Sequence, residues 1–271
     1  RRHTAVAPTR AWSSMTVRFH RYVAIGDSST EGMDDPDDRG GYRGWANRLA
    51  ERIAAIQSSL LYANLGVRGR RTRQIREQQL EPALAMKPDL VTLFSGTNDV
   101  VRRHFDPEGF RKDLEAIQLA LIASGATVIG FTLPDLTPVM PLGRLIRGKV
   151  AALNDQIRAA SMASGAICVD MASHPVGSDP RLWSGDRLHA NALGHARIAA
   201  ALAHGLGLPG SDDSWSHPLP PLPAVGFLEP IRAELRWVTG HLLPWVWRHA
   251  HGRSSGDGRG PKRPALRPVE V

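Results

Sequence analysis

The chain has 271 residues, of which 42% are hydrophobic and 22% are charged, a composition that fits one globular α/β domain with appendages. Its formal charge of +8 comes from the two ends. Residues 1–22 hold five arginines and no acidic residue, and residues 251–271 hold five basic residues against two acidic ones. The part between them is formally neutral, which argues against a nucleic-acid-binding surface on the folded body.

The sequence predicts no membrane-spanning helix, because it contains no run of about 20 apolar residues. The N-terminus is basic but lacks the apolar core of a signal peptide, which favours a cytoplasmic location. The single cysteine, Cys168, excludes an internal disulfide. It lies in the apolar run AICVD, so we expect a buried and unreactive thiol.

Apolar runs and amphipathic segments alternate along the chain. Five short apolar runs predict buried strands at 21–26, 59–65, 89–95, 126–132 and 166–169. Helical spacing of apolar residues predicts helices at 45–57, 72–86, 107–124, 145–163 and 192–205. Pro82 marks an interruption or a new first turn in the second helix, and Asn191 is a candidate N-cap for the last. This alternation predicts a mostly parallel sheet covered on both faces, with the strand C-termini at one edge.

The composition divides the chain into an N-terminal extension over 1–20 and an α/β domain over 21–207. A Pro-rich linker is predicted over 208–226, and a disordered basic tail over 251–271. Between them, residues 227–250 predict an amphipathic helical segment. This segment either packs on the body or makes weak contact with a membrane surface, where Trp and Arg side chains settle well.

The sequence GDSS at 26–29 places Ser28 directly after the first predicted strand. A tight turn out of a buried strand exposes the Ser28 hydroxyl and a nearby backbone N–H, which suits a nucleophile. Ser28 and Glu31 also fit the S-x-x-E pattern of a helix capping box, and this interpretation is the stronger one on local sequence alone. The two are compatible, because a helix N-terminus stabilises developing negative charge.

The sequence DRLH at 186–189 supplies a candidate base. A serine reacts only if a base takes its proton, and His189 is of the residue type that does so near neutral pH. Asp186, three residues earlier, can fold back to orient the imidazole. The alternative is that Asp186 caps a helix and that His189 is an ordinary surface histidine.

Three groups at predicted strand ends are candidate hydrogen-bond donors to an oxyanion: the amides of Ser28 and Gly66 and the side chain of Asn98. Taken singly, Gly66 also fits a turn at a strand end, and Asn98 fits an Asx-turn in GTND. Because these residues follow the first, second and third strands, we expect them to converge at one edge of the sheet.

Together, GDSS at 26–29, NLGVRG at 64–69, GTND at 96–99 and DRLH at 186–189 resemble the four ordered signature blocks of the SGNH/GDSL hydrolase family. The resemblance covers roughly residues 20–205, and its specificity comes from the ordered set rather than from any one block. It implies a flavodoxin-like three-layer α/β/α sandwich with a mostly parallel five-stranded sheet, followed here by a C-terminal helical appendage.

The resemblance also implies an esterase or lipase with Ser28 as nucleophile, His189 as base and Asp186 as orienting acid. Gly66 and Asn98, with the Ser28 amide, would form the oxyanion hole. The implied partner is a small-molecule or lipid acyl ester, with no metal and no cofactor. An acyltransferase or thioesterase using the same site remains open, and so does a catalytically silent membrane-surface protein.

Three further patterns have competing interpretations. Arg68 and Arg70 begin an arginine cluster that is an exposed helix face, a contact to an anionic part of the substrate, or a partner of the acidic loop across the mouth of the site. GRSSG at 252–256 matches the nucleophile elbow of other hydrolases, but its polar flanks and the absence of a following histidine exclude it. The acidic run at 31–38 lacks the spacing of a calcium-binding loop, so we interpret it as solvated.

Overall fold

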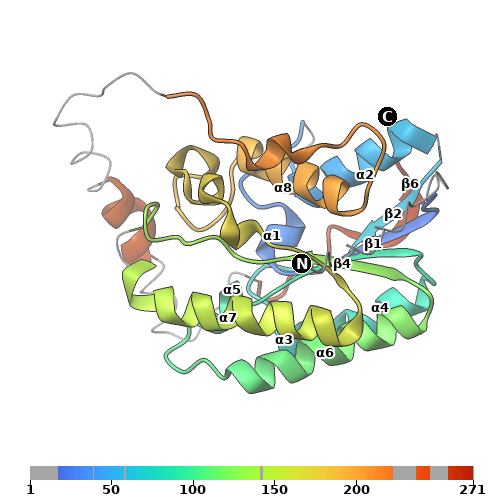
Figure 1. The fold of residues 1–271 in the computed structure, drawn as a ribbon, viewed down its shortest axis with the longest axis horizontal. Coiled ribbons are helices and arrows are strands. Elements are labelled where there is room, and N and C mark those ends of the chain that lie inside the picture. The colour runs from blue at the N-terminus through green and yellow to red at the C-terminus, as the bar shows by residue number, and fades with distance from the viewer. Residues whose placement is uncertain are drawn as a thin grey trace, which may run out of the picture.

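The structure is a computed structural model that describes residues 18–38, 40–57, 59–140, 143–221, 236–244 and 256–270. Figure 1 shows a twisted sheet between two layers of helices. Residues 1–17 of the predicted extension over 1–20, and the parts of the C-terminal segment at 227–235 and 245–250, lie outside the described residues.

Six strands form one sheet. They are β1 (Arg21–Gly26), β2 (Leu61–Asn64), β3 (Leu90–Phe94), β4 (Thr127–Phe131), β5 (Ile167–Val169) and β6 (Arg263–Pro268). Their order across the sheet is β5-β4-β3-β1-β2-β6, and only β6 runs antiparallel to its neighbour. The five parallel strands have the flavodoxin-like order, which confirms the predicted fold class and leaves one strand more than expected.

Eight α-helices flank the sheet in the described part of the chain. They are α1 (Ser28–Glu31), α2 (Gly44–Gln57), α3 (Thr72–Gln78), α4 (Leu80–Ala85), α5 (Thr97–Val100), α6 (Pro107–Ala123), α7 (Gly143–Ser164) and α8 (Ala192–Gly205). Helices α2 and α8 cover one face, and α3, α4, α6 and α7 cover the other (Figure 1). As predicted, Asn191 caps α8, because its side chain accepts hydrogen bonds from the amides of Leu193 and Gly194.

The helix predicted over 72–86 is divided at Gln79. The Gln79 side chain lies 2.8 Å from the amide nitrogen of Gly26 and 2.9 Å from its carbonyl oxygen, so it satisfies the backbone at the end of β1. Pro82 then lies in the first turn of α4, where its missing N–H costs little. This contact anchors the end of β1, directly before the turn that carries Ser28.

Aromatic side chains fill the core between the sheet and the α2/α8 layer. Phe94 of β3 stacks on Phe131 of β4 with 4.2 Å between ring centroids, and Trp45 of α2 meets Phe131 edge-on. All five residues of β3 are buried, as expected for a central parallel strand with both faces covered. Both phenyl rings also line the pocket beside the candidate site.

The prediction of a disordered tail over 251–271 is wrong for β6. Arg263–Pro268 pairs antiparallel with β2, and the Arg263 side chain donates to the Tyr62 carbonyl at 2.8 Å. Lys262 donates to the carbonyls of Tyr42 and Arg43 at 2.7 and 3.0 Å. Prolines are tolerated because β6 is an edge strand. The side chains of Lys262 and Arg263 bind carbonyl oxygens of the body rather than remaining in solvent.

The predicted linker also packs on the domain, as far as it is described. Residues 208–221 include the 3₁₀ turn η4 (Asp213–Ser216), and Trp215 within it is buried. Residues 236–244 are helical around the π-helical turn η5 (Val238–Leu242), as predicted for the appendage. No helix in the described ranges is long and apolar enough to cross a membrane.

Candidate active site

The turn after β1 presents Ser28 as the first residue of α1. Gly26 adopts a φ of +153°, and a Cβ at this position would lie 2.2 Å from Thr30 Oγ1. The Asp27 side chain caps the short helix by accepting a hydrogen bond from the Ser29 amide at 3.0 Å. The N-cap residue of α1 is therefore Asp27, which directly precedes Ser28.

The capping box suggested for Ser28 and Glu31 does not form. The Glu31 carboxylate instead accepts hydrogen bonds from the backbone amide of Arg68 at 2.9 Å and from its side-chain Nε at 3.0 and 3.1 Å. Both side chains are almost completely buried. Because Asp27 caps the helix, the Ser28 hydroxyl is available for another partner.

That partner is His189. Its Nε2 lies 2.8 Å from Ser28 Oγ, and its Nδ1 lies 2.6 Å from Asp186 Oδ2. An ionised Asp186 can only accept, so Nδ1 carries the hydrogen and Nε2 accepts from the serine hydroxyl. The structure thus brings together the three residues predicted from the separate segments at 26–29 and 186–189.

The loop from Ser184 to His189 fixes this arrangement through its own hydrogen bonds. Asp186 Oδ1 accepts from the amides of Leu188 and His189 at 2.9 and 3.0 Å, and the Ser184 amide donates to the His189 carbonyl at 2.8 Å. Arg187 adopts a φ of +62°, which lets the chain reverse sharply. The alternative of a helix cap with a surface histidine is wrong, since the His189 side chain is only 12% exposed.

A second carboxylate, which the sequence did not reveal, faces the histidine. Asp34 Oδ2 lies 3.8 Å from His189 Nδ1 and accepts a hydrogen bond from the Ser184 hydroxyl at 2.6 Å. The same hydroxyl lies 2.7 Å from Asp186 Oδ1, so two carboxylates share one hydroxyl hydrogen. Asp34 belongs to the acidic run interpreted as solvated, and no local pattern distinguishes it from its neighbours.

Burial and charge oppose each other at the histidine. Burial lowers the pKa of His189, but the hydrogen bond and charge of Asp186, with further charge from Asp34 and Asp27, raise that pKa above its ordinary value overall. Burial raises the pKa of Asp186, and the contact with His189 reverses this and holds the pKa well below its usual range. The site therefore favours an imidazolium–carboxylate pair whenever His189 accepts a proton.

The prediction that the Gly66 amide is an oxyanion donor is wrong. This amide donates to Asn64 Oδ1 at 2.9 Å inside the body of the protein. A Cβ on Gly66 would lie 2.8 Å from the Glu31 amide nitrogen, so the glycine serves close packing beneath α1. Gly69, three residues later, has a φ of +78°, and no hydrogen bond within the described residues engages its N–H.

Asn98 lies where the nucleophile turn and the segment after β2 meet. Its Nδ2 donates to the Arg70 carbonyl at 3.1 Å and approaches Asp27 Oδ2 at 3.3 Å, so it makes no Asx-turn. These two contacts place Asn98 next to Gly69, which precedes Arg70, and next to Ser28, which follows Asp27. The Ser28 N–H has no acceptor in the part of the chain that is described. Burial raises the pKa of Asp27 to about 7, because the carboxyl is cut off from water.

The two arginines proposed for substrate contact have different environments. Arg68 is 7% exposed and bound to Glu31, so its predicted alternative of pairing with the acidic loop is confirmed and its contact with substrate is contradicted. Arg70 is half-buried, and its Nε has no hydrogen-bond partner among the described residues. Arg70 therefore remains a candidate for an anionic part of the substrate.

Asp34, Asp186 and His189 also offer three ligand-type atoms within 4.8 Å of one another. These side chains already hydrogen bond to each other or to Ser184. A metal ion there would displace the contact that orients the imidazole, so we assign no metal to this group.

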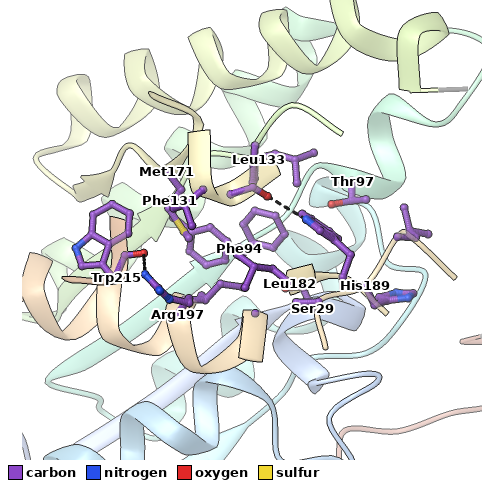
Figure 2. A pocket seen from close by; sticks show the side chains of 18 of the residues that line it. Ser29, Phe94, Thr97, Phe131, Leu133, Met171, Leu182, His189, Arg197 and Trp215 are labelled. Carbon is purple, nitrogen blue, oxygen red and sulfur yellow. Dashed lines mark hydrogen bonds between the residues drawn. The ribbon is translucent and has the colours of Figure 1, made fainter. Parts of the chain in front are cut away.

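An apolar pocket extends from the serine and histidine. Figure 2 shows Ser29, Thr97 and His189 at one end of it and Arg197 and Trp215 at the other. Between the ends lie mainly apolar side chains, among them Phe94, Phe131, Leu133, Met171, Val176 and Leu182. The site thus joins a polar end to an apolar pocket, which suits a substrate with a polar bond and an apolar chain.

Residues 24–197 match the model of the GDSL-like lipase/acylhydrolase family. The chain belongs to this family. As a GDSL-like acylhydrolase, it is an ester-hydrolysing enzyme of the esterase and lipase type. No curated protein is similar enough in sequence to match it.

Solved structures of other enzymes have the same fold. An α/β hydrolase from the metagenome of Lake Arreo, Spain, is 24% identical with a TM-score of 0.60, over 69% of this chain and 95% of that one. The lipase/acylhydrolase of Enterococcus faecalis is also 24% identical with a TM-score of 0.57, over 69% and 95%. A catalytic mutant of the acetylxylan esterase Axe2 from Geobacillus stearothermophilus is 18% identical with a TM-score of 0.62, over 75% and 99%.

The GDSL-like region contains Ser28, Asn98, Asp186 and His189, but two contacts to the site come from beyond it. Trp215 lines the pocket, and the Trp237 indole donates to the Asp186 carbonyl at 3.0 Å. These contacts show that the C-terminal part of this chain supports the site directly. Trp237 packs on the body, as one interpretation of the 227–250 segment predicted, and weak membrane contact by the rest of that segment stays a prediction.

Proposed function

We propose that the protein is a serine esterase that hydrolyses carboxylic acyl esters through an acyl-enzyme intermediate on Ser28. The observation that carries this proposal is the chain of contacts from Ser28 Oγ through His189 to Asp186, at 2.8 and 2.6 Å. Such a chain lets a serine lose its proton as it attacks.

In the first step, Ser28 Oγ bonds to the acyl carbon while its proton moves to His189 Nε2. The His189 Nδ1–H stays hydrogen bonded to Asp186, which stabilises the imidazolium. Collapse of the tetrahedral intermediate breaks the bond to the alcohol oxygen, which takes the proton from Nε2. Water then gives a proton to His189 and attacks the acyl-enzyme, and the proton returns to Ser28 as the carboxylic acid leaves.

The developing oxyanion needs donors that are unused or that can leave a weak contact. We assign this role to the amides of Ser28 and Gly69 and to Asn98 Nδ2, with Gly69 replacing Gly66. The N–H groups of Ser28 and Gly69, which have no acceptor among the described residues, support the first two donors. Asn98 would exchange its long 3.3 Å contact with Asp27 for the oxyanion.

Hydrolysis of 4-nitrophenyl acyl esters tests the proposal. Ser28→Ala and His189→Ala should each lose most of the turnover with little change in KM, because they remove the nucleophile and the base. Ser173→Ala and His204→Ala, on exposed residues away from the site, serve as matched controls that keep activity. Normal turnover in a folded Ser28→Ala variant would contradict the proposal.

Transfer to another acceptor uses the same chemistry, with an alcohol in place of water. Product analysis in the presence of added alcohol distinguishes hydrolysis from acyl transfer. We expect the free acid as the main product, and a predominance of the transesterified product would instead favour an acyltransferase. A matched acyl thioester run alongside the oxygen ester likewise compares thioesterase with esterase activity.

A further inference from the structure

We infer that Trp215 closes the far end of the acyl pocket and sets the longest acyl chain that the enzyme accepts. This inference rests on the proposed function, since it assumes that the acyl group lies in the pocket beside Ser28. Trp215 is 6% exposed and stands at the opposite end of the pocket from His189 (Figure 2). It lies beyond residue 197, where the family match ends.

The lining between these two ends suits a hydrocarbon chain. Phe94, Phe131 and Leu133 are buried apolar side chains contributed by the central strands and the loop after β4. The charged lining residue near Trp215 is Arg197, and its Nη1 donates to the carbonyls of residues 214, 215 and 217 at 2.6 to 3.0 Å. An apolar chain can therefore enter without leaving this charge unpaired.

The small size of the pocket favours a short chain. Its volume of about 60 Å³ is several times the roughly 10–15 Å³ that a single water molecule requires. We therefore expect short acyl chains, of about four to six carbons, to fit best. A longer chain would meet the indole of Trp215.

Trp215 is held in place firmly enough to act as a wall. Three arginines of the body donate to backbone carbonyls of the segment that carries it: Arg52 to Gly210, Arg197 to residues 214, 215 and 217, and Arg181 to Pro220. The Asp212 side chain caps η4 through the Ser214 amide at 3.0 Å, and the His174 ring packs against the indole with 4.7 Å between centroids. Because Trp215 is held at several points, we expect activity to fall sharply rather than gradually once the acyl chain exceeds the length of the pocket.

The test is a series of 4-nitrophenyl esters from acetate to decanoate. We expect kcat/KM of the wild-type enzyme to rise up to butanoate or hexanoate, by at most about fourfold per buried methylene, and to fall for octanoate and decanoate. Trp215→Ala should move the optimum at least two carbons longer and raise the octanoate-to-butanoate ratio of kcat/KM about 16-fold. Trp215→Phe, which keeps most of the wall, should give a smaller shift in the same direction.

A second variant keeps the inference testable if Trp215→Ala does not fold. Val176→Phe narrows the same pocket and should move the optimum to shorter chains. Met162→Ala removes an exposed side chain of α7 that is 86% accessible and should leave the profile unchanged. A wild-type optimum at decanoate would overturn the inference. So would an unchanged profile in folded Trp215→Ala or in Val176→Phe.

Failure of this inference and failure of the proposed function look different. An enzyme that hydrolyses esters through Ser28, but with a length profile that ignores Trp215, overturns only the pocket inference. A protein with no Ser28-dependent hydrolysis of any ester overturns both.

Discussion

The indole Nε1 of Trp237 donates a hydrogen bond to the backbone carbonyl of Asp186 at 3.0 Å. The guanidinium of Arg187 lies over the Trp237 ring, 4.7 Å from its centroid. Trp237 is 5% exposed, so it lies against the loop that carries the acid and the base. We conclude that Trp237 is a positioning residue for this loop.

Replacing Trp237 should therefore impair turnover without removing a reacting group. Trp237→Phe removes the hydrogen bond but keeps an aromatic ring, and we expect kcat to fall about threefold to tenfold. Trp237→Ala should lower kcat further, with KM for a short ester little changed. Steady-state kinetics measures both, and Leu243→Ala, on an exposed residue of the same segment, is the control. Equal kcat in Trp237→Ala and wild type would remove the positioning role.

The two carboxylates at His189 make a pH prediction. In the proposed mechanism activity requires neutral His189, and both Asp186 and Asp34 raise the pKa of this residue. Removing either negative charge lowers that pKa, so the acid limb of kcat/KM should move to lower pH in Asp186→Asn and, by less, in Asp34→Asn. Asp186→Asn should also lower kcat about 10- to 100-fold, the effect of losing one charge-assisted hydrogen bond.

A pH–rate profile of each variant between pH 4.5 and 9 checks this pair of expectations. Asp135→Asn, on a carboxylate that pairs with Arg147, is a control that should leave the acid limb in place. An acid limb that stays fixed in both site variants, or moves to higher pH, would show that these carboxylates do not set the pKa of His189.

Arg70 should select for anionic substrates. Its side-chain Nε lacks a partner in the described structure, and its carbonyl contacts Asn98. Arg70→Gln should raise KM about threefold to tenfold for esters that carry a carboxylate, with KM for neutral esters unchanged. Arg73→Gln, on an exposed arginine paired with Glu77, serves as control. Equal effects on charged and neutral esters would rule out this subsite.

His195 links stability to pH. It is completely buried, its Nδ1 accepts from the Trp45 amide at 3.1 Å, and its Nε2–H donates to the Met33 carbonyl at 2.9 Å. Burial lowers the pKa of His195 to about 4. The unfolded chain binds this proton near pH 6.5, whereas the folded chain does not until about pH 4, so stability falls as the pH drops through this range.

The expected loss in free energy of unfolding between pH 6.5 and 4 is up to about 3 kcal/mol from this residue. Urea denaturation at several pH values measures it. His195→Gln keeps an acceptor and a donor but cannot titrate, so its stability should decline less steeply with acid. The exposed His204→Gln is the control. Identical slopes for His195→Gln and wild type would contradict the assignment.

Local patterns in the sequence were sufficient to predict the five parallel strands and the helices between them. The buried strands of a parallel sheet are continuous apolar runs, so β1 to β5 stand out, and Asn191 marks the start of α8 through its capping chemistry. Ser28, Asp186 and His189 were predicted as one site because the four ordered sequence blocks resemble those of the family, whereas each block alone favoured a structural role. Their meeting point follows from the topology rather than from spacing along the chain.

The missed features depend on contacts between distant segments. Strand β6 contains two prolines and two arginines, and it becomes a strand only because the edge of β2 offers it hydrogen bonds. Trp215 lies in a Pro-rich stretch that is fixed by arginines from elsewhere in the chain. The Gly66 N–H donates to Asn64 Oδ1, whereas the Gly69 N–H has no acceptor among the described residues. The sequence does not reveal this difference, because it depends on the position of the Asn64 side chain.

The most direct test of the central claim is covalent labelling of Ser28 by a fluorophosphonate, followed by peptide mass spectrometry. The account predicts one label on Ser28 in the wild-type enzyme, none on that peptide in Ser28→Ala, and a labelling rate in His189→Ala at least about 100-fold lower. The tail serines of GRSSG at 252–256 should stay unlabelled. A folded wild-type protein that hydrolyses esters but carries its label on another serine would contradict the account.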